Sequence, residues 1–120
     1  GQFLGGLNKG QRPTANMCSP GTEVDIDSKM ATRHCISSNS KTYHDERWIS
    51  VEFEVYSDSL IRHIVEKDTV MTYTNIRIGG GYLFPRFKNK IGAPVKEGYI
   101  ALQSESHPIE FKNIMIKELD

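Results

Sequence analysis

The chain has no excess of charge of either sign and no long apolar run. Among its 120 residues, 15 lysines and arginines balance 15 aspartates and glutamates, so the formal net charge is zero at pH 7. A chain without a net positive field lacks the attraction that draws proteins to nucleic acids, and we expect no such partner. No apolar run approaches the roughly 20 residues of a membrane-spanning helix, so we expect no transmembrane segment.

Cysteine is scarce, and the short metal-binding motifs are missing. Cys18 and Cys35 are too far apart for a CxxC redox or zinc motif. Two loop cysteines can pair in an oxidising compartment or stay reduced in the cytosol, and the residues alone leave both states open. No HxH or HExxH spacing occurs, so a zinc site would need ligands from separate strands.

Length and composition indicate an ordinary globular domain. Domains usually contain about 100 to 150 residues, so we expect residues 1–120 to form a single domain or the C-terminal part of one. Charged residues make up 25% and hydrophobic residues 38% of the chain, unlike the composition of disordered proteins. Because Gly1 is not an initiator methionine, we expect the chain to be processed or cut from a longer protein.

The sequence does contain the alternating pattern of β-strands. Apolar and polar residues alternate over 48–56, and polar turns separate this segment from extended patterns over 60–65 and 69–74. Further extended patterns cover 2–7, 23–27, 99–104 and 109–116. A phase slip near Asn113 predicts a β-bulge, and residues 79–98 predict a long irregular loop. Because no segment has convincing helical periodicity, short strands joined by turns predict an antiparallel β-sandwich.

Three groups of polar residues can carry chemistry, and the first is acidic. Glu23, Asp25 and Asp27 share one face of a predicted strand, and retaining glycosidases hold their paired carboxyl groups about 5 Å apart. The run resembles the E-x-D-x-E motif of laminarinase-like sandwiches, except that the shorter Asp27 replaces the final glutamate. The alternative interpretation is a solvated acidic strand face.

The second group consists of histidines with basic or aromatic neighbours. Its members are Arg33-His34, Tyr43-His44, Arg62-His63 and His107. A histidine can act as a general base, a metal ligand or a hydrogen-bonding partner of a sugar, and an adjacent arginine can hold a carbonyl or anionic oxygen. For each histidine the alternative is a structural hydrogen-bonding role.

The third group lies at the predicted turn between the last two strands. Gln103 and Glu105 share a strand face, His107 follows at the turn, and Glu110 comes shortly after. Amide, carboxylate and imidazole groups in this arrangement can converge on a polyhydroxylated ligand. The alternative is a solvated hairpin tip.

The same C-terminal region carries a specific motif. Residues 98–114 read GYIALQSESHPIEFKNI. This run resembles the closing hairpin of the 3-keto-disaccharide hydrolase family, whose pattern is G-Y-I-x-L-Q followed by P-(I/V)-x-(F/W)-(R/K)-N-I. Upstream segments resemble a subgroup of that family in order and spacing, over 16–22, 32–35, 40–44 and 61–65. The resemblance implies a concanavalin A-like jelly-roll β-sandwich, of which this chain is the C-terminal portion.

The resemblance also implies an activity on an oligosaccharide or glycoside whose sugar is oxidised at C3. The ketone acidifies the C2 hydrogen, so a base can remove it and the aglycone can leave by elimination, after which water adds. This path needs a base, a proton source and an enolate stabiliser, either a divalent metal ion or a cationic donor. The implied catalytic candidates are His34, Glu105 and His107, and the substrate-binding candidates are Arg33, Arg62, His63, Gln103 and Glu110. The alternatives on the same fold are a non-catalytic carbohydrate-binding module and a purely structural sandwich.

The family is typical of exported bacterial proteins, often anchored as lipoproteins. The resemblance therefore implies a periplasmic or extracellular location, with lipid anchoring of the full-length form. Such a compartment lets Cys18 and Cys35 pair, and we predict this disulfide.

Overall fold

The computed structural model describes residues 1–120, and their regular structure is almost entirely β. The elements are β1 (Met17–Cys18), β2 (Thr22–Ile26), β3 (Lys29–Met30), β4 (Cys35–Ile36), β5 (Val51–Tyr56), β6 (Leu60–Val65), β7 (Asp68–Ile78) and one 3₁₀ helix, η1 (Pro85–Lys90). Every pair of neighbouring strands is antiparallel. The prediction of an all-β antiparallel fold is confirmed.

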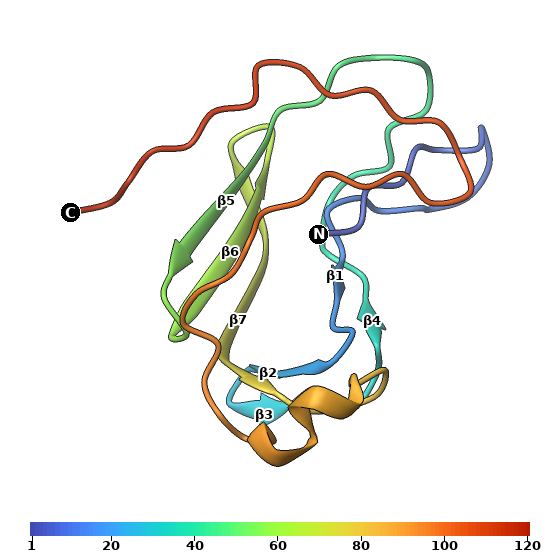
Figure 1. Ribbon diagram of the computed structural model, residues 1–120. Helices are drawn as coiled ribbons and strands as arrows, with labels where there is room; N and C mark the ends of the chain where they lie inside the picture. The colour runs from blue at the N-terminus through green and yellow to red at the C-terminus, as the bar shows by residue number, and fades with distance from the viewer.

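The strands form two sheets of unequal size. The larger sheet has five strands in the order β3-β2-β7-β6-β5, and the smaller sheet pairs β1 with β4. In Figure 1, β5, β6 and β7 stand opposite the β1–β4 pair, while β2, β3 and η1 lie together at one end. This arrangement of two facing layers is consistent with a β-sandwich.

Tight turns join the consecutive strands of the larger sheet. Glu66 and Lys67, between β6 and β7, both have positive φ, and so do Asp27 and Ser28, between β2 and β3. Two adjacent residues with positive φ suit the mirror-image turns whose twist matches that of the flanking strands. Because Asp27 belongs to such a turn, the prediction that it continues the strand face of Glu23 and Asp25 is wrong.

The core lies where the two sheets face each other, and it is small. One buried cluster contains Met17, Val24, Met71, Tyr73 and Ile76, and a second contains Ala15, Val65 and Val70. Only 13 of the 120 residues are buried. A core of this size leaves a large share of the stability to individual hydrogen bonds and to covalent links.

The central strands agree with the sequence prediction. The strand over 60–65 is found as predicted, and that over 48–56 is found in its second part, Val51–Tyr56. The strand predicted over 69–74 is longer, because the far end of β7 pairs with β2 through Glu23 and Arg77. The predicted irregular loop after β7 contains η1 and one isolated bridge between Arg77 and Pro94.

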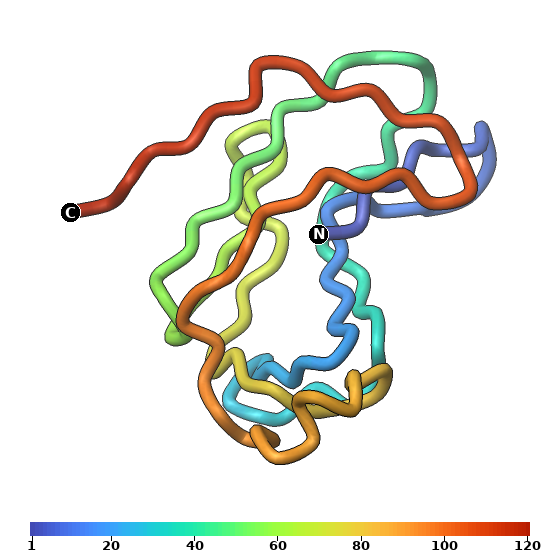
Figure 2. The backbone as a smooth tube through the Cα atoms, in the orientation of Figure 1, coloured from blue at the N-terminus to red at the C-terminus, as the bar shows by residue number.

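The strands predicted over 99–104 and 109–116 are wrong. No strand follows β7, and no backbone–backbone hydrogen bond involves residues 96–120. This segment instead crosses the molecule and returns over its far end as an extended chain (Figure 2). Tyr99 and Met115 are 105% and 86% exposed. Alternation predicts an extended backbone, but a strand also needs a neighbouring edge with which to pair. Asn113 has a φ of 53°, so the chain changes direction where the apolar phase slips.

A disulfide links the two strands of the smaller sheet. Cys18 and Cys35 lie opposite each other in the β1–β4 pair, and their sulfur atoms are bonded. The predicted disulfide is therefore confirmed, and it is consistent with a location outside the cytoplasm. The structure has no helix with the length and apolar character required to cross a membrane.

Candidate functional site

Backbone carbonyl groups hold His107 at the turn over residues 104–107 of the C-terminal segment, which we call the tip. Its Nδ1 lies 2.6 Å from the carbonyl oxygen of Glu105, and its Nε2 lies 3.3 Å from that of Phe3. Ser104 Oγ donates to the carbonyl oxygen of His107 at 2.9 Å, which closes the turn. A carbonyl oxygen only accepts, and a neutral imidazole has a single N–H, so the neutral ring donates in one of these two contacts at a time. The half-buried ring is thus held between two backbone carbonyl groups.

The N-terminal segment connects this tip to a second histidine. Beyond Phe3, the amide of Gly6 donates to the carbonyl oxygen of Tyr43 at 2.7 Å, and that of Asn8 donates to His44 Nδ1 at 3.0 Å. Because Nδ1 accepts, the proton of a neutral His44 ring is on Nε2. His44 therefore presents an N–H donor on the side away from Asn8.

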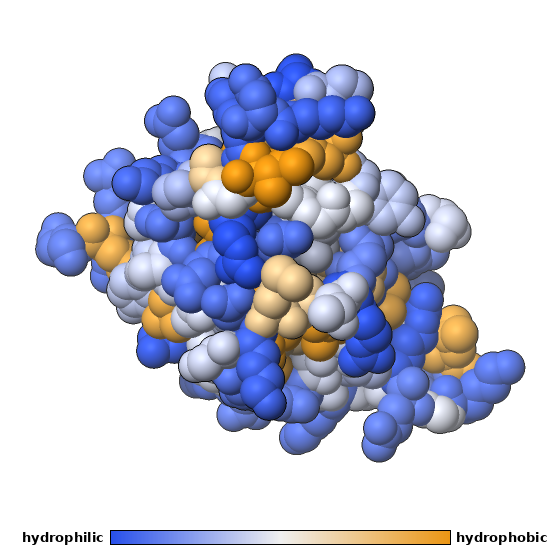
Figure 3. All heavy atoms as spheres, turned by 90° about the horizontal axis from the view of Figure 1, so that it is seen from below, coloured by the Kyte–Doolittle hydropathy of each residue, from blue (hydrophilic) through white to orange (hydrophobic).

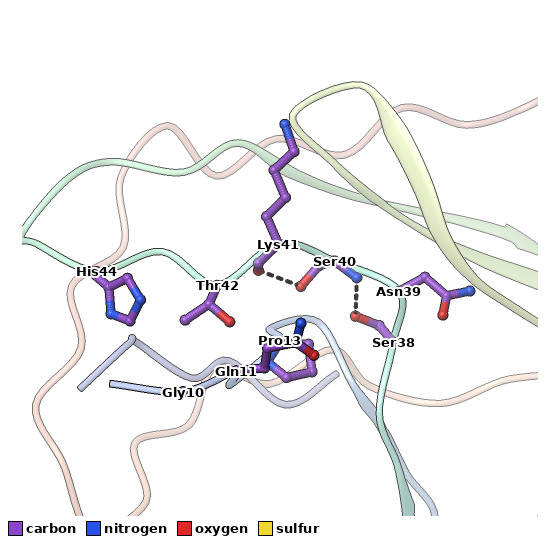
Figure 4. A pocket seen from close by; sticks show the side chains of 9 residues that line it. All are labelled: Gly10, Gln11, Pro13, Ser38, Asn39, Ser40, Lys41, Thr42 and His44. Carbon is purple, nitrogen blue, oxygen red and sulfur yellow. Dashed lines mark hydrogen bonds between the residues drawn. The ribbon is translucent and has the colours of Figure 1, made fainter. Parts of the chain in front are cut away.

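Next to His44 the surface contains a polar hollow of about 570 Å³ (Figure 4). It is lined by Gly10, Gln11, Pro13, Ser38, Asn39, Ser40, Lys41, Thr42 and His44, none of them hydrophobic. This volume is within the range of small-ligand sites, although most such sites have a larger apolar share. The chemistry of the lining favours a ligand rich in hydroxyl groups.

Several hydroxyl groups of the hollow also join its two walls. Thr42 Oγ1 and Ser40 Oγ each accept from a backbone amide, of Arg12 and Thr14 respectively, at 2.7 Å. Ser38 Oγ donates to the carbonyl oxygen of Thr14 at 2.6 Å. These bonds fix the walls relative to each other, so the hollow is a formed feature of the fold.

His34 and Arg33 lie at the opposite end of the molecule, between β3 and β4. The His34 ring lies 4.8 Å from that of Tyr82, centroid to centroid, and its carbonyl oxygen accepts from the Ser19 amide at 2.9 Å. Arg33 is exposed and takes part in no ion pair. These two candidates are therefore not gathered with Glu105 and His107.

Arg62 and His63 project from opposite faces of β6, because successive strand residues alternate. Arg62 faces outward and pairs with Glu54 at 3.0 Å. His63 faces the core, where its ring is completely buried. Its Nδ1 donates to the carbonyl oxygen of Ala15 at 2.7 Å, and its Nε2 accepts from the Tyr73 hydroxyl at 3.0 Å. His63 thus has a structural hydrogen-bonding role.

Burial is the main cause of the lowered pKa of His63; its hydrogen bond to Ala15 opposes the shift, and the charge of the N-terminus lowers the pKa further. Burial also raises the pKa of Tyr73 to about 12. Both shifts keep this buried pair neutral, which suits the hydrogen bond between the two rings.

The lowered pKa of His63 predicts a stability that declines in mild acid. Between the ordinary pKa of 6.5 and the lower folded-state value, the unfolded chain binds a proton that the folded chain does not. The free energy of unfolding should therefore fall as the pH drops below 6.5, which urea titrations at pH 7.5, 6 and 5 will measure. In His63→Gln this decline should become shallower, and an unchanged slope would contradict the assignment.

Two carboxylates of the acidic motif form ion pairs with a neighbouring arginine. Arg77 pairs with Glu23 at 3.5 Å and with Asp25 at 3.1 Å, and Asn75 Nδ2 donates to Asp25 at 2.8 Å. The hydrogen bond from Asn75 lowers the pKa of Asp25, and Arg77 lowers it further. Two carboxylates bound to one guanidinium stabilise the β2–β7 pairing, as expected of a charged strand face rather than of a glycosidase pair.

Removing Arg77 should therefore change how Asp25 titrates. In Arg77→Gln we expect the pKa of Asp25 to rise part of the way toward its ordinary 3.8, because the Asn75 hydrogen bond remains. The carboxyl carbon shift of Asp25, followed by NMR as the pH falls, reports this directly. Arg62→Gln, which breaks the Arg62–Glu54 ion pair, is the matched control and should leave the pKa of Asp25 unchanged.

The remaining predicted site residues lie in the solvent. The side chains of Gln103, Glu105 and Glu110 are exposed and make no hydrogen bond or ion pair within the chain. They are free to meet a ligand, but nothing in the fold fixes their orientation. No group of three or more His, Cys, Asp or Glu side chains is placed to hold a metal ion.

Sequence reasoning missed the polar hollow. Its signal is the run SSNSKT over 37–42, which supplies four hydroxyl side chains in six positions. Small polar residues favour loops in general, so the run alone does not distinguish a binding surface from a connection. Its pairing with residues 10–14 depends on contacts that are distant in sequence.

Comparison with known proteins identifies a family that matches this chain. The family model described as the 3-keto-alpha-glucoside-1,2-lyase-like domain matches residues 2–117. No curated protein and no solved structure matches the chain.

Proposed function

Because the chain belongs to the 3-keto-alpha-glucoside-1,2-lyase-like domain family, we propose that it cleaves glycosides whose sugar carries a ketone at C3. The observation that carries this proposal is the family match, which covers nearly the whole chain. Carbohydrate-related activity follows from the family; the reaction and the residues below are our proposal.

The reaction is an elimination across C1 and C2. A base takes the C2 proton, which the neighbouring ketone has made acidic, and the electron pair of the broken C–H bond becomes the enolate. The C1–C2 double bond then forms as the C1–O bond breaks, and the departing oxygen takes a proton. Later addition of water to the double bond completes a net hydrolysis.

We assign the proton transfers to His107 and Glu105 and the binding of the sugar to the polar hollow beside His44. The support is the partly exposed imidazole of His107, which backbone carbonyl groups hold in place, and the exposed carboxylate of Glu105 two residues away. His44 Nε2–H would donate to the ketone oxygen, where negative charge develops. His34, Arg33 and Gln103 remain candidates for contacts with the rest of a longer substrate.

The test is to incubate the full-length protein with a 3-keto-glucoside that has a chromogenic aglycone and to follow aglycone release. Release above the uncatalysed rate is the expected result. No release, together with binding of the unoxidised sugar, would overturn the enzyme assignment. Repeating the assay with a chelator decides between a recruited metal ion and a side-chain donor as the enolate stabiliser.

Replacing His107 with alanine should lower turnover. We expect a loss of about tenfold, less than the 10²–10⁴ of a fully enclosed acid–base group, because the ring is partly solvated. Glu105→Gln should have a similar effect on kcat. Glu118→Gln, an exposed acid on the same segment, is the matched control and should leave turnover unchanged. Unchanged rates for both site variants would remove the tip from the mechanism.

One observation favours a second function, a non-catalytic carbohydrate-binding module. The histidine candidates are scattered over the fold: His34 lies beside Tyr82, His63 in the core and His107 beside Phe3. A binding module needs only exposed hydrogen bonders and aromatic rings, whereas an acid–base enzyme needs these groups to converge.

We also propose that residues 1–120 act as one domain in a periplasmic or extracellular protein, lipid-anchored in its full-length form. The disulfide supports an oxidising compartment. Fractionation of the native host, with the protein followed by antibody, tests the location and the anchor.

A further inference from the structure

Two parts of the chain that lack acidic residues meet at the end of the molecule formed by β2, β3 and η1. Residues 28–44 and 69–96 contain lysine and arginine but no aspartate or glutamate. Backbone hydrogen bonds bring the second part to the β1–β2 turn, from Gly21 to Gly81 at 2.8 Å and from Gly79 to Gly21 at 3.2 Å. The ring contact between His34 and Tyr82 joins the two parts directly.

This end of the molecule presents two aromatic rings to solvent. Tyr82 is 77% exposed and Phe84 is 66% exposed. Tyr82 has a φ of 62°, in the left-handed region that bulky residues rarely adopt. Backbone strain of this kind collects at functional sites, where the surrounding structure maintains it. Here the strained backbone directs a large ring outward, against His34, instead of into the small core.

Basic side chains flank the rings without neutralising partners. The Arg86 guanidinium lies 5.7 Å from the Phe84 ring and 4.9 Å from the Phe87 ring, and Lys90 lies 6.0 Å from the latter. The acids of β2 at this end, Glu23 and Asp25, pair with Arg77. None of Arg33, Arg86, Lys88 and Lys90 takes part in an ion pair. Figure 3 shows the molecule from this side, with hydrophobic groups set among strongly hydrophilic ones.

We propose that this surface, formed by Arg33, His34, Tyr82, Phe84 and Arg86, binds an acidic polysaccharide. The apolar C–H faces of sugar rings would lie on Tyr82 and Phe84, and carboxylate groups along the chain would meet the guanidinium groups of Arg33 and Arg86. A neutral glycan fits less well, because the unpaired cations would have no counterpart. Nucleic acid fits less well because the family supports a carbohydrate-related function.

The proposal rests on the carbohydrate-related function of the family, and it deepens that function by naming the class of polymer. It assigns His34 a binding role in place of one in the chemical step and keeps Arg33 as a binding residue. The surface would hold a substrate chain or a cell-wall polymer while cleavage takes place elsewhere on the molecule.

The test is affinity electrophoresis of the full-length protein through gels that contain polygalacturonate, neutral dextran or single-stranded DNA. Polygalacturonate should retard the protein, and dextran should not. Tyr82→Gly removes the ring while it suits the left-handed backbone, so it should fold normally and bind at least tenfold more weakly. Arg86→Gln should also weaken binding. Tyr99→Ala, which removes a more exposed ring on the C-terminal segment, is the control.

Equal retardation of the wild type and Tyr82→Gly would overturn the proposal, as would equal retardation by dextran or DNA. The cleavage assay is independent of this measurement. Failure of aglycone release with retention of polygalacturonate binding would refute only the proposed reaction. Cleavage without polygalacturonate binding would refute only this surface.

Discussion

Replacing Cys18 and Cys35 with serine should lower the free energy of unfolding by about 3 kcal/mol, the chain-entropy value for a loop of this size. The bond joins residues 17 positions apart and holds β1 to β4. That two-residue pairing is too short to persist without other support. Met17 would lose its fixed position in the core at the same time.

Urea unfolding with and without a reductant measures this effect. The wild type should lose the same free energy on reduction as it loses in the double variant, whereas the double variant should not respond to reductant. Equal midpoints for the reduced and oxidised wild type would contradict the prediction, since they would mean that the β1–β4 pair is held by its other contacts alone.

Replacing His63 with alanine should cost a similar amount, about 3 kcal/mol. The substitution empties a site that is completely buried. It also leaves the Ala15 carbonyl oxygen and the Tyr73 hydroxyl without their partner. Because the same ring fills the space between Phe53 and Tyr73, with centroids at 4.6 Å and 5.3 Å, packing is lost on both sides.

Tyr73→Phe separates the hydrogen bond from the packing. It removes only the hydroxyl that donates to His63, so we expect a loss of about 1 kcal/mol. Thermal unfolding of the two variants beside the wild type gives both values. If His63→Ala cost no more free energy of unfolding than Tyr73→Phe, the His63 ring would contribute little packing, and the prediction would be contradicted.

The β5–β6–β7 part of the larger sheet could be predicted from sequence because its pattern is local. Apolar alternation and short polar turns identify β5, β6 and β7, and a strand that pairs with its neighbour along the chain needs no further information. The disulfide followed from the family resemblance, whereas the two cysteines alone left their state open.

The C-terminal segment and the candidate site could not be predicted this way. Residues 99–116 have the same alternation as β5, yet no sheet edge accepts them, and the availability of an edge is a property of the whole fold. Similarly, the alternation of side chains along a strand predicts that Arg62 and His63 point to opposite faces of β6. Which of the two faces the core depends on the segment around Ala15, which covers β6. The polar hollow joins residues 10–14 to 38–44, whose contact no local pattern records.

The backbone amides of the molecule fall into two classes, those bonded within the sheet and those of the extended segment after residue 95. In β5, β6 and β7 each bonded amide exchanges with deuterium only when the sheet opens, so its rate reflects the stability of the fold. The amides of residues 96–120 have no backbone acceptor, and they should exchange almost as quickly as those of an unfolded peptide. The segment that carries Glu105 and His107 is therefore held by a few side chains, and a substrate that bridges it to the rest of the molecule would slow its exchange.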